Sequence, residues 1–294
     1  MLRRQKTILA LLAESHRPVP RTVLVKLAFL LRRETVLRDD PAFYDFVPYR
    51  YGPFSFALYR ELDGLHRDGF VTKADGQLAL NTQMITTIRE RISELAGTVR
   101  AAVSFVTRMY GRTARRDLVR DIYARYPWYA THSQLTNLKP MNLTIRQPAK
   151  PAVYTAGYQH KSVDDFFDDL LRAGIQVVID VRANPVSRKY GFTRSFMCGI
   201  AEKLGMEYCH FPRLGIPRKE RTGLGSEASY IHLLNTYESE VLPDLRTDVE
   251  ELARMMKKKP SVLVCMEQDV RNCHRSRLAM AVSKVSGLPI HHIT

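Results

Sequence analysis

Cysteine and long apolar runs are both scarce in this sequence. Four cysteines in 294 residues are too few for a disulfide framework, so we expect a reducing, cytoplasmic location. No apolar run approaches the roughly 18 residues that a membrane span requires, so we expect no membrane segment. The apolar stretch after the basic start, residues 8–12, is too short for a signal peptide and is predicted to belong to a first helix.

Acidic residues are scarce in the first half of the chain. The whole sequence has a formal net charge of +15. Residues 1–150 hold 25 Lys and Arg against 13 Asp and Glu, whereas residues 151–294 hold 20 against 17. A concentrated positive field attracts polyanions, so the front half is predicted to bind nucleic acid, and double-stranded DNA in particular. The alternative is that this charge serves general solubility.

Residues 1–138 are predicted to form a winged-helix-like helical domain with a helical extension. Apolar residues recur with helical spacing in three places, and Asp75-Gly76 is a strong signal for a two-residue hairpin. Three helices followed by a hairpin is the order of a winged helix, which is a variant of helix-turn-helix. The predicted elements are helices over 6–14, 21–33 and from Gly52-Pro53 to Gly69, the hairpin around 75–76, and one long helix over 84–110.

Arginine and aromatic residues are interleaved between residues 108 and 129. Arginine contacts phosphate and aromatic rings stack on bases, so Arg112, Arg115 and Arg116 are predicted to bind nucleic acid. The alternative is a solvated helix face whose aromatic residues pack inward. Residues 139–151 contain three prolines without periodicity and are predicted to be a linker.

Residues 152–294 alternate between strand and helix patterns, which is typical of an open, mainly parallel α/β sheet. We therefore expect an α/β protein overall. The predicted strands cover 152–155, 176–181, 207–211, 261–265 and 289–293. The predicted helices cover 162–173, 196–204, 230–242, 245–257 and a last one capped by Asn272 that ends at Gly287.

Ionisable residues follow four of these strands, and ligands of open α/β sheets bind at the carboxyl ends of the strands. We expect a pocket there in which Glu267 acts as general acid or base. Asp180 is the second candidate carboxylate, or else an anchor for Arg182 or His274. The arginines expected to bind phosphate in this half are Arg182, Arg188, Arg213 and Arg275.

Three other kinds of site stay open at this point. A thiol nucleophile would use Cys265 or Cys273 with His160 or His274. A metal site would use Cys265, Cys273 and His274, but their spacing matches no standard zinc pattern, and adjacent Cys and His side chains are expected to point apart. We therefore predict no metal and no cofactor. The last possibility is a binding pocket without catalysis.

Four sequence blocks in the back half resemble one family. They are Tyr154-Thr155-Ala156-Gly157-Tyr158, Asp180 to Pro185 with Ser187-Arg188, Phe211 to Gly215, and Cys265-Met266-Glu267 with Cys273-His274-Arg275. These blocks occur in the order found in the family called domain of unknown function 488, over about residues 152–294. The family commonly has His where Tyr158 stands, and here the histidine comes later, at His160. The resemblance implies an α/β fold and leaves the reaction open.

The front half resembles the winged helices of antitoxin-like and DNA-associated proteins, through Tyr51-Gly52-Pro53-Phe54 and residues 58–62. Together the two halves lead us to expect an enzyme that acts on a DNA base or its glycosidic bond, in repair or modified-base processing. One alternative is a winged-helix regulator whose α/β half senses a nucleotide-like ligand. Another is an interaction module of a phage-defence or toxin–antitoxin system, without direct DNA binding.

Overall fold

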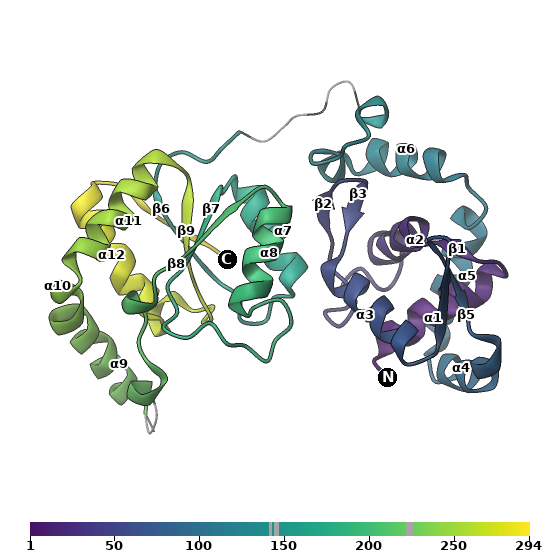
Figure 1. The fold of residues 1–294 in the computed structure, drawn as a ribbon, viewed down its shortest axis with the longest axis horizontal. Helices are drawn as coiled ribbons and strands as arrows, with labels where there is room; N and C mark the ends of the chain where they lie inside the picture. The colour runs from purple at the N-terminus through teal and green to yellow at the C-terminus, as the bar shows by residue number, and fades with distance from the viewer. Residues whose placement is uncertain (141–142, 144–146, 222–225) are drawn as a thin grey trace. The chain divides into compact units, whose positions relative to one another are not determined.

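The computed structural model describes residues 1–140, 143, 147–221 and 226–294 (Figure 1). The chain divides into two units, Met1–Ile145 and Arg146–Thr294, each with its own internal contacts. Among the residues described, we find no helix with the length and apolarity needed to cross a membrane.

The first unit contains the three predicted helices and the predicted hairpin, but the third helix begins at Phe56, because Gly52 and Pro53 belong to a strand of a second hairpin instead of opening the helix. The elements are α1 (Arg3–Ser15), β1 (Val19–Pro20), α2 (Arg21–Glu34), β2 (Val47–Tyr49), β3 (Gly52–Phe54), α3 (Phe56–Arg67), β4 (Val71–Ala74) and β5 (Gln77–Leu80). Asp75 and Gly76 both have positive φ, 49° and 72°, as a two-residue hairpin turn with right-handed strand twist requires. The two-residue strand β1 joins this hairpin in an antiparallel sheet of order β1-β5-β4, a pairing that the sequence did not predict.

The prediction of one long helix over 84–110 is wrong. The segment forms α4 (Ile85–Ser93) and α5 (Gly97–Tyr110), separated by Glu94, Leu95 and Ala96. Leu95 is buried in the core, and Ala96 has extended backbone with ψ 145°. This break turns the chain so that both α4 and α5 pack against α1. Burial of Leu95 thus outweighs the continuous helical pattern. The unit ends with α6 (Arg115–Arg125) and short 3-10 turns.

The second unit is built on a five-stranded parallel sheet, which confirms the predicted fold class. Its order is β10-β6-β9-β7-β8, and every neighbouring pair is parallel. The strands are β6 (Val153–Gly157), β7 (Val177–Asp180), β8 (Glu207–His210), β9 (Ser261–Cys265) and β10 (Ile290–Ile293). The helices are α7 (Val163–Ala173), α8 (Arg194–Lys203), α9 (Glu227–Thr236), α10 (Leu242–Asp244), α11 (Arg246–Lys258) and α12 (His274–Ser286).

Helices cover both faces of this sheet, with α7 and α8 on one side and α11 and α12 on the other (Figure 1). Both faces of β7 and β9 are therefore buried, which explains why these strands are nearly continuous apolar runs. The parallel register pairs Gly157 with Cys265 and Asp180 with Val264. The carboxyl ends of three central strands therefore meet at one edge.

Different residues cap the starts of α7 and α12. The side chain of Ser162 accepts a hydrogen bond from the Asp165 amide and caps α7. The predicted Asn272 cap of the last helix is wrong, because Asn272 ends a short 3-10 turn and Cys273 takes the N-cap position. Asp269 instead caps that short turn through the Arg271 amide. Because of this extra turn, Cys273 and not Asn272 immediately precedes α12.

A lysine is buried in the first unit. Lys26 on α2 is 4% exposed, and its Nζ donates a 2.8 Å hydrogen bond to the Pro53 carbonyl. It lines a cavity of about 220 Å³ whose walls include Tyr49, Phe54 and Tyr59. Burial lowers the pKa of Lys26 to about 7. The lysine is therefore largely neutral in the folded protein above that pH.

We expect this lysine to make the stability of the first unit pH-dependent. In the unfolded chain Lys26 keeps an ordinary pKa near 10.4, so between about pH 7 and pH 10 the unfolded state binds more protons, and stability rises with pH. The slope from this group is at most about 1.4 kcal/mol per pH unit. Lys26→Met should remove that slope in denaturant unfolding series at several pH values. Lys73→Met, at a surface ion pair with Asp63, should keep it, and an unchanged slope in Lys26→Met would contradict the assignment.

Candidate functional site at the carboxyl edge of the parallel sheet

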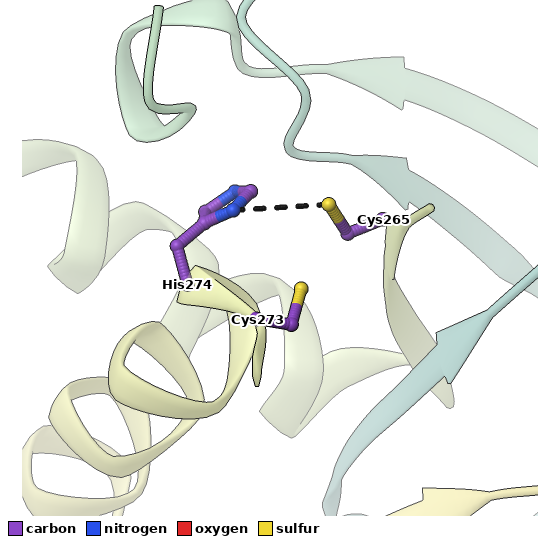
Figure 2. A group of neighbouring side chains, drawn as sticks. All are labelled: Cys265, Cys273 and His274. Atoms are coloured by element: carbon purple, nitrogen blue, oxygen red, sulfur yellow. Dashed lines mark hydrogen bonds between the residues drawn. The ribbon is translucent and has the colours of Figure 1, made fainter. Parts of the chain in front are cut away.

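The side chains of Cys265, Cys273 and His274 converge where β9 ends and α12 begins (Figure 2). They are 1%, 0% and 4% exposed, and the two sulfurs and one imidazole nitrogen all lie within 4.8 Å of one another. Cys273 has extended backbone (φ −144°, ψ 132°), whereas His274 is the first helical residue. The backbone turns between them, so the expectation that these adjacent side chains point apart is wrong.

The ring of His274 is held in one orientation. Its Nε2 lies 3.0 Å from the carbonyl oxygen of Val181, and its Nδ1 lies 3.7 Å from the sulfur of Cys265. A carbonyl can only accept, so Nε2 carries the proton, and in the neutral ring the lone pair of Nδ1 faces the sulfurs. The ring of Tyr237 packs edge-on against the imidazole, with centroids 5.6 Å apart. Tyr237 gave no signal in the sequence, because it lies within an ordinary helical apolar pattern.

Glu267 receives both thiols on one carboxylate oxygen. Its Oε2 accepts hydrogen bonds from Cys265 at 3.0 Å and from Cys273 at 3.2 Å, while Oε1 lies 3.7 Å from the guanidinium of Arg221. Burial acts to raise the pKa of Glu267, but hydrogen bonds from the two thiols and from the backbone, together with nearby His274, outweigh it, so the pKa lies below its usual value. Burial raises the pKa of the Cys273 thiol, and neighbouring Cys265 adds to this. The lowered pKa of Glu267 and the raised pKa of Cys273 both fit protonated thiols that donate to an ionised carboxylate.

The loop that carries Glu267 is fixed on two sides. The buried guanidinium of Arg275 donates to the backbone carbonyls of Glu267 and Gln268. On the other side, a Cβ atom at Gly157 would lie 2.0 Å from the Glu267 carbonyl oxygen. No side chain fits in that space, which accounts for the glycine in the block Tyr154 to Tyr158. Arg275 was predicted to bind phosphate, and the structure gives it internal partners instead.

Asp180 and Arg182 form a buried ion pair. The guanidinium donates to both carboxylate oxygens, at 2.8 and 2.5 Å, and the hydroxyl of Tyr208 donates to Oδ2 at 2.7 Å. Arg182 also donates to the Tyr158 hydroxyl at 2.7 Å and to the Phe192 carbonyl at 2.8 Å. Burial acts to lower the pKa of Arg182, but Asp180 raises it above its usual value. This arrangement matches the alternative in which Asp180 anchors Arg182.

The remaining predicted residues of the second unit lie apart from the cysteine cluster. His160 has φ 64° and lines a shallow cavity with Asp269 and His292. Arg188 is exposed, and Arg213 is 65% exposed and pairs with Asp248 at 3.2 Å. The structure therefore brings together Glu267, the two cysteines and His274, with Arg275 bonded to the backbone of Glu267, whereas His160, Arg188 and Arg213 have other surroundings.

In the first unit the three arginines predicted to bind nucleic acid stay exposed, while two of the rings expected to stack on bases are buried. Arg112, Arg115 and Arg116 are exposed, and Arg112 lines a cavity of about 710 Å³ with Arg17 and Arg108. In contrast, the rings expected to stack on bases include Tyr123 and Tyr129, which are buried in the core. The inward packing of these two rings matches the alternative interpretation, while the arginines keep a solvent-facing positive surface.

Comparison with known proteins covers part of the second unit. Residues 162–282 match the model of a family described as Domain of unknown function DUF488. This stretch contains three of the four sequence blocks that resemble the family, and Tyr154 to Tyr158 precede it. The match supports the resemblance for the second unit, over less than half of the chain. No curated protein matches the sequence significantly.

Proposed function

We propose that this protein is a DNA-binding hydrolase that acts on a base or on its glycosidic bond, with Glu267 as the catalytic carboxylate. The observation that carries the proposal is the contrast between two carboxylates at one sheet edge. Glu267 has a side chain that is 16% exposed, with Oε1 directed toward Arg221. Asp180 is fully buried, with both oxygens bonded to Arg182 and Tyr208. Glu267 is thus the group that a substrate or a water molecule can reach.

The surroundings of Glu267 suit a carboxylate that stays ionised and acts as a positioned base. Two thiols fix Oε2 by hydrogen bonds, and Arg275 fixes the backbone of the same residue. A carboxylate held in this way can take a proton from an attacking water or stabilise positive charge on a sugar ring. Arg221 beside Oε1 supplies a cation for a phosphate of the extruded nucleotide.

The first unit supports the DNA-binding part of the proposal. Its elements run helix, strand, helix, hairpin β2-β3, helix and hairpin β4-β5, which resembles the order of a winged helix with the hairpin β2-β3 inserted. In that interpretation α3 is the recognition helix, and it exposes Arg60 and Arg67. The excess of basic residues lies in this half of the sequence.

The chemical test uses the full chain and duplex DNA that carries a panel of damaged and modified bases. We expect mass spectrometry to detect a released or altered base from at least one duplex, and no product from undamaged DNA. If no duplex in the panel changes chemically while the protein binds DNA, the hydrolase proposal fails. The winged-helix regulator with a ligand-sensing α/β unit then replaces it. If the protein neither binds nor changes DNA, both fail.

DNA affinity is expected to fall steeply with salt concentration. Binding through phosphates releases counterions, so log K should fall linearly with log salt. The triple substitution of Arg112, Arg115 and Arg116 by Ala should weaken binding to all DNA sequences alike. The slope of log K against log salt should fall by about one for each phosphate that is no longer neutralised. Fluorescence anisotropy at several salt concentrations measures both quantities. The matched control is Arg246→Ala with Arg254→Ala on α11, which should change neither. Binding that is insensitive to salt would contradict this part of the proposal.

A further inference from the structure

Two sulfurs and an imidazole nitrogen are directed at one buried point at the start of α12. Figure 2 shows the side chains of Cys265, Cys273 and His274 converging there from the end of β9 and the first residues of the helix. Their donor atoms lie within 4.8 Å of one another, and all three residues are buried. Sulfur and imidazole donors in this number are the ligand set of a zinc-class site. In the proposed catalysis the two thiols only hold Glu267 in place, and Nδ1 of His274 has no role.

The orientation of His274 is a second, independent observation. A histidine that binds a metal through one nitrogen usually donates its other N–H to a carbonyl or carboxylate, which fixes the ring. Here the backbone carbonyl of Val181 accepts from Nε2 at 3.0 Å. The remaining nitrogen, Nδ1, faces the sulfur of Cys265 at 3.7 Å. The ring is thus preset with its lone pair toward the two cysteines.

Glu267 adds negative charge beside the same point. Its Oε2 lies 3.0 and 3.2 Å from the two sulfurs. A thiol becomes a metal ligand only as the thiolate, so binding releases the proton of each cysteine to solvent, two protons per ion. The two thiolates balance the charge of a divalent cation, and the third protein ligand is a neutral imidazole.

We propose that Cys265, Cys273 and His274 together bind one divalent cation of the zinc class. The ion ties the end of β9 to the first turn of α12 and, through His274, to Val181 after β7. This site requires no reaction and no DNA. The thiolates that hold the ion no longer donate to Glu267, so in the metal-bound protein Arg275, and not the thiols, fixes that residue. Cys265 lies eight residues before Cys273 and nine before His274, a spacing that the familiar zinc patterns do not include.

The test is a metal titration of the full chain, purified under reducing conditions and stripped of metal by a chelator. Cobalt(II) is the probe, because thiolate ligands give it a charge-transfer absorption in the near ultraviolet. We expect the absorption to saturate at one equivalent, zinc to displace it, and two protons to be released per ion. Cys265→Ser and His274→Gln should lose the absorption. Cys198→Ser, a cysteine on α8 outside the cluster, should keep it.

Several results would overturn this site. Wild-type protein that gives no thiolate absorption and releases no protons lacks the site, and this measurement does not depend on the folding of any variant. Absorption that persists in Cys265→Ser or disappears in Cys198→Ser assigns the metal to other residues. A disulfide between Cys265 and Cys273, found by mass spectrometry in protein that binds no metal, would make the pair a redox couple instead.

Discussion

Glu267→Gln is expected to reduce turnover on a reactive DNA substrate by about 100-fold or more, the usual scale for a positioned acid or base. Glutamine keeps the size of the side chain and an oxygen that can accept from the two thiols. It cannot take up a proton or carry the negative charge, so the chemical step should be lost while binding remains. Single-turnover rates of base release measure the effect.

Two further measurements distinguish catalysis from structure. DNA affinity and the unfolding midpoint of Glu267→Gln should stay close to wild type, because the change is nearly isosteric. If Glu267→Gln remains active while Cys265→Ser is inactive and folded, the essential group is the sulfur, and the carboxylate assignment fails. If Glu267→Gln unfolds, the carboxylate holds the thiols in place and the edge of the sheet has a structural role.

Asp180→Asn is expected to destabilise the second unit by about 3–5 kcal/mol, the cost of leaving a buried charge without its partner. Arg182 would remain 6% exposed with its positive charge uncompensated. Urea unfolding followed by circular dichroism measures the loss in the transition that belongs to this unit. Combining Asp180→Asn with Arg182→Met should restore part of the stability, because the second change removes the unpaired charge.

The matched control for this pair is Glu207→Gln, on the neighbouring strand β8. Glu207 pairs with Lys259, and both side chains are at least half exposed, so we expect a loss below about 1 kcal/mol. If Asp180→Asn were as stable as wild type and yet inactive on DNA, Asp180 would be a catalytic group and the proposed roles of the two carboxylates would have to be exchanged.

Local chemistry made much of the fold predictable. Asp75-Gly76 predicts its hairpin because both residues tolerate positive φ, and the apolar runs at 176–181 and 261–265 predict buried parallel strands. The place of Cys265 and Glu267 at the carboxyl end of the sheet was predictable, because one ends the apolar run 261–265 and the other follows it by two residues. The break at Leu95 was not predictable, because it depends on how α4 and α5 both pack against α1.

The geometry of the cysteine cluster was predictable only in part. The sequence places Cys273 and His274 at the start of a helix, but their convergence depends on the backbone dihedrals of a single N-cap residue. The engagement of Asp180 with Tyr208 depends on the register between β7 and β8, which pairs Asp180 with His210. Pairings between strands far apart in sequence leave no local signal, so the division of roles between the two carboxylates required the structure.

The first turn of α12 connects loops from two strands. His274 is bonded to the Val181 carbonyl, and Arg275 is bonded to the carbonyls of Glu267 and Gln268. The N-terminal end of this helix therefore cannot fray without releasing both loops, although helix ends usually open first. In native-state hydrogen exchange its last turn, near Ser286, would open by local fluctuation, whereas its first turn would open only when the whole sheet unfolds. Amide protection from exchange would therefore be higher at the first turn of α12 than at its last turn, because only the first turn is bonded to the loops that follow β7 and β9.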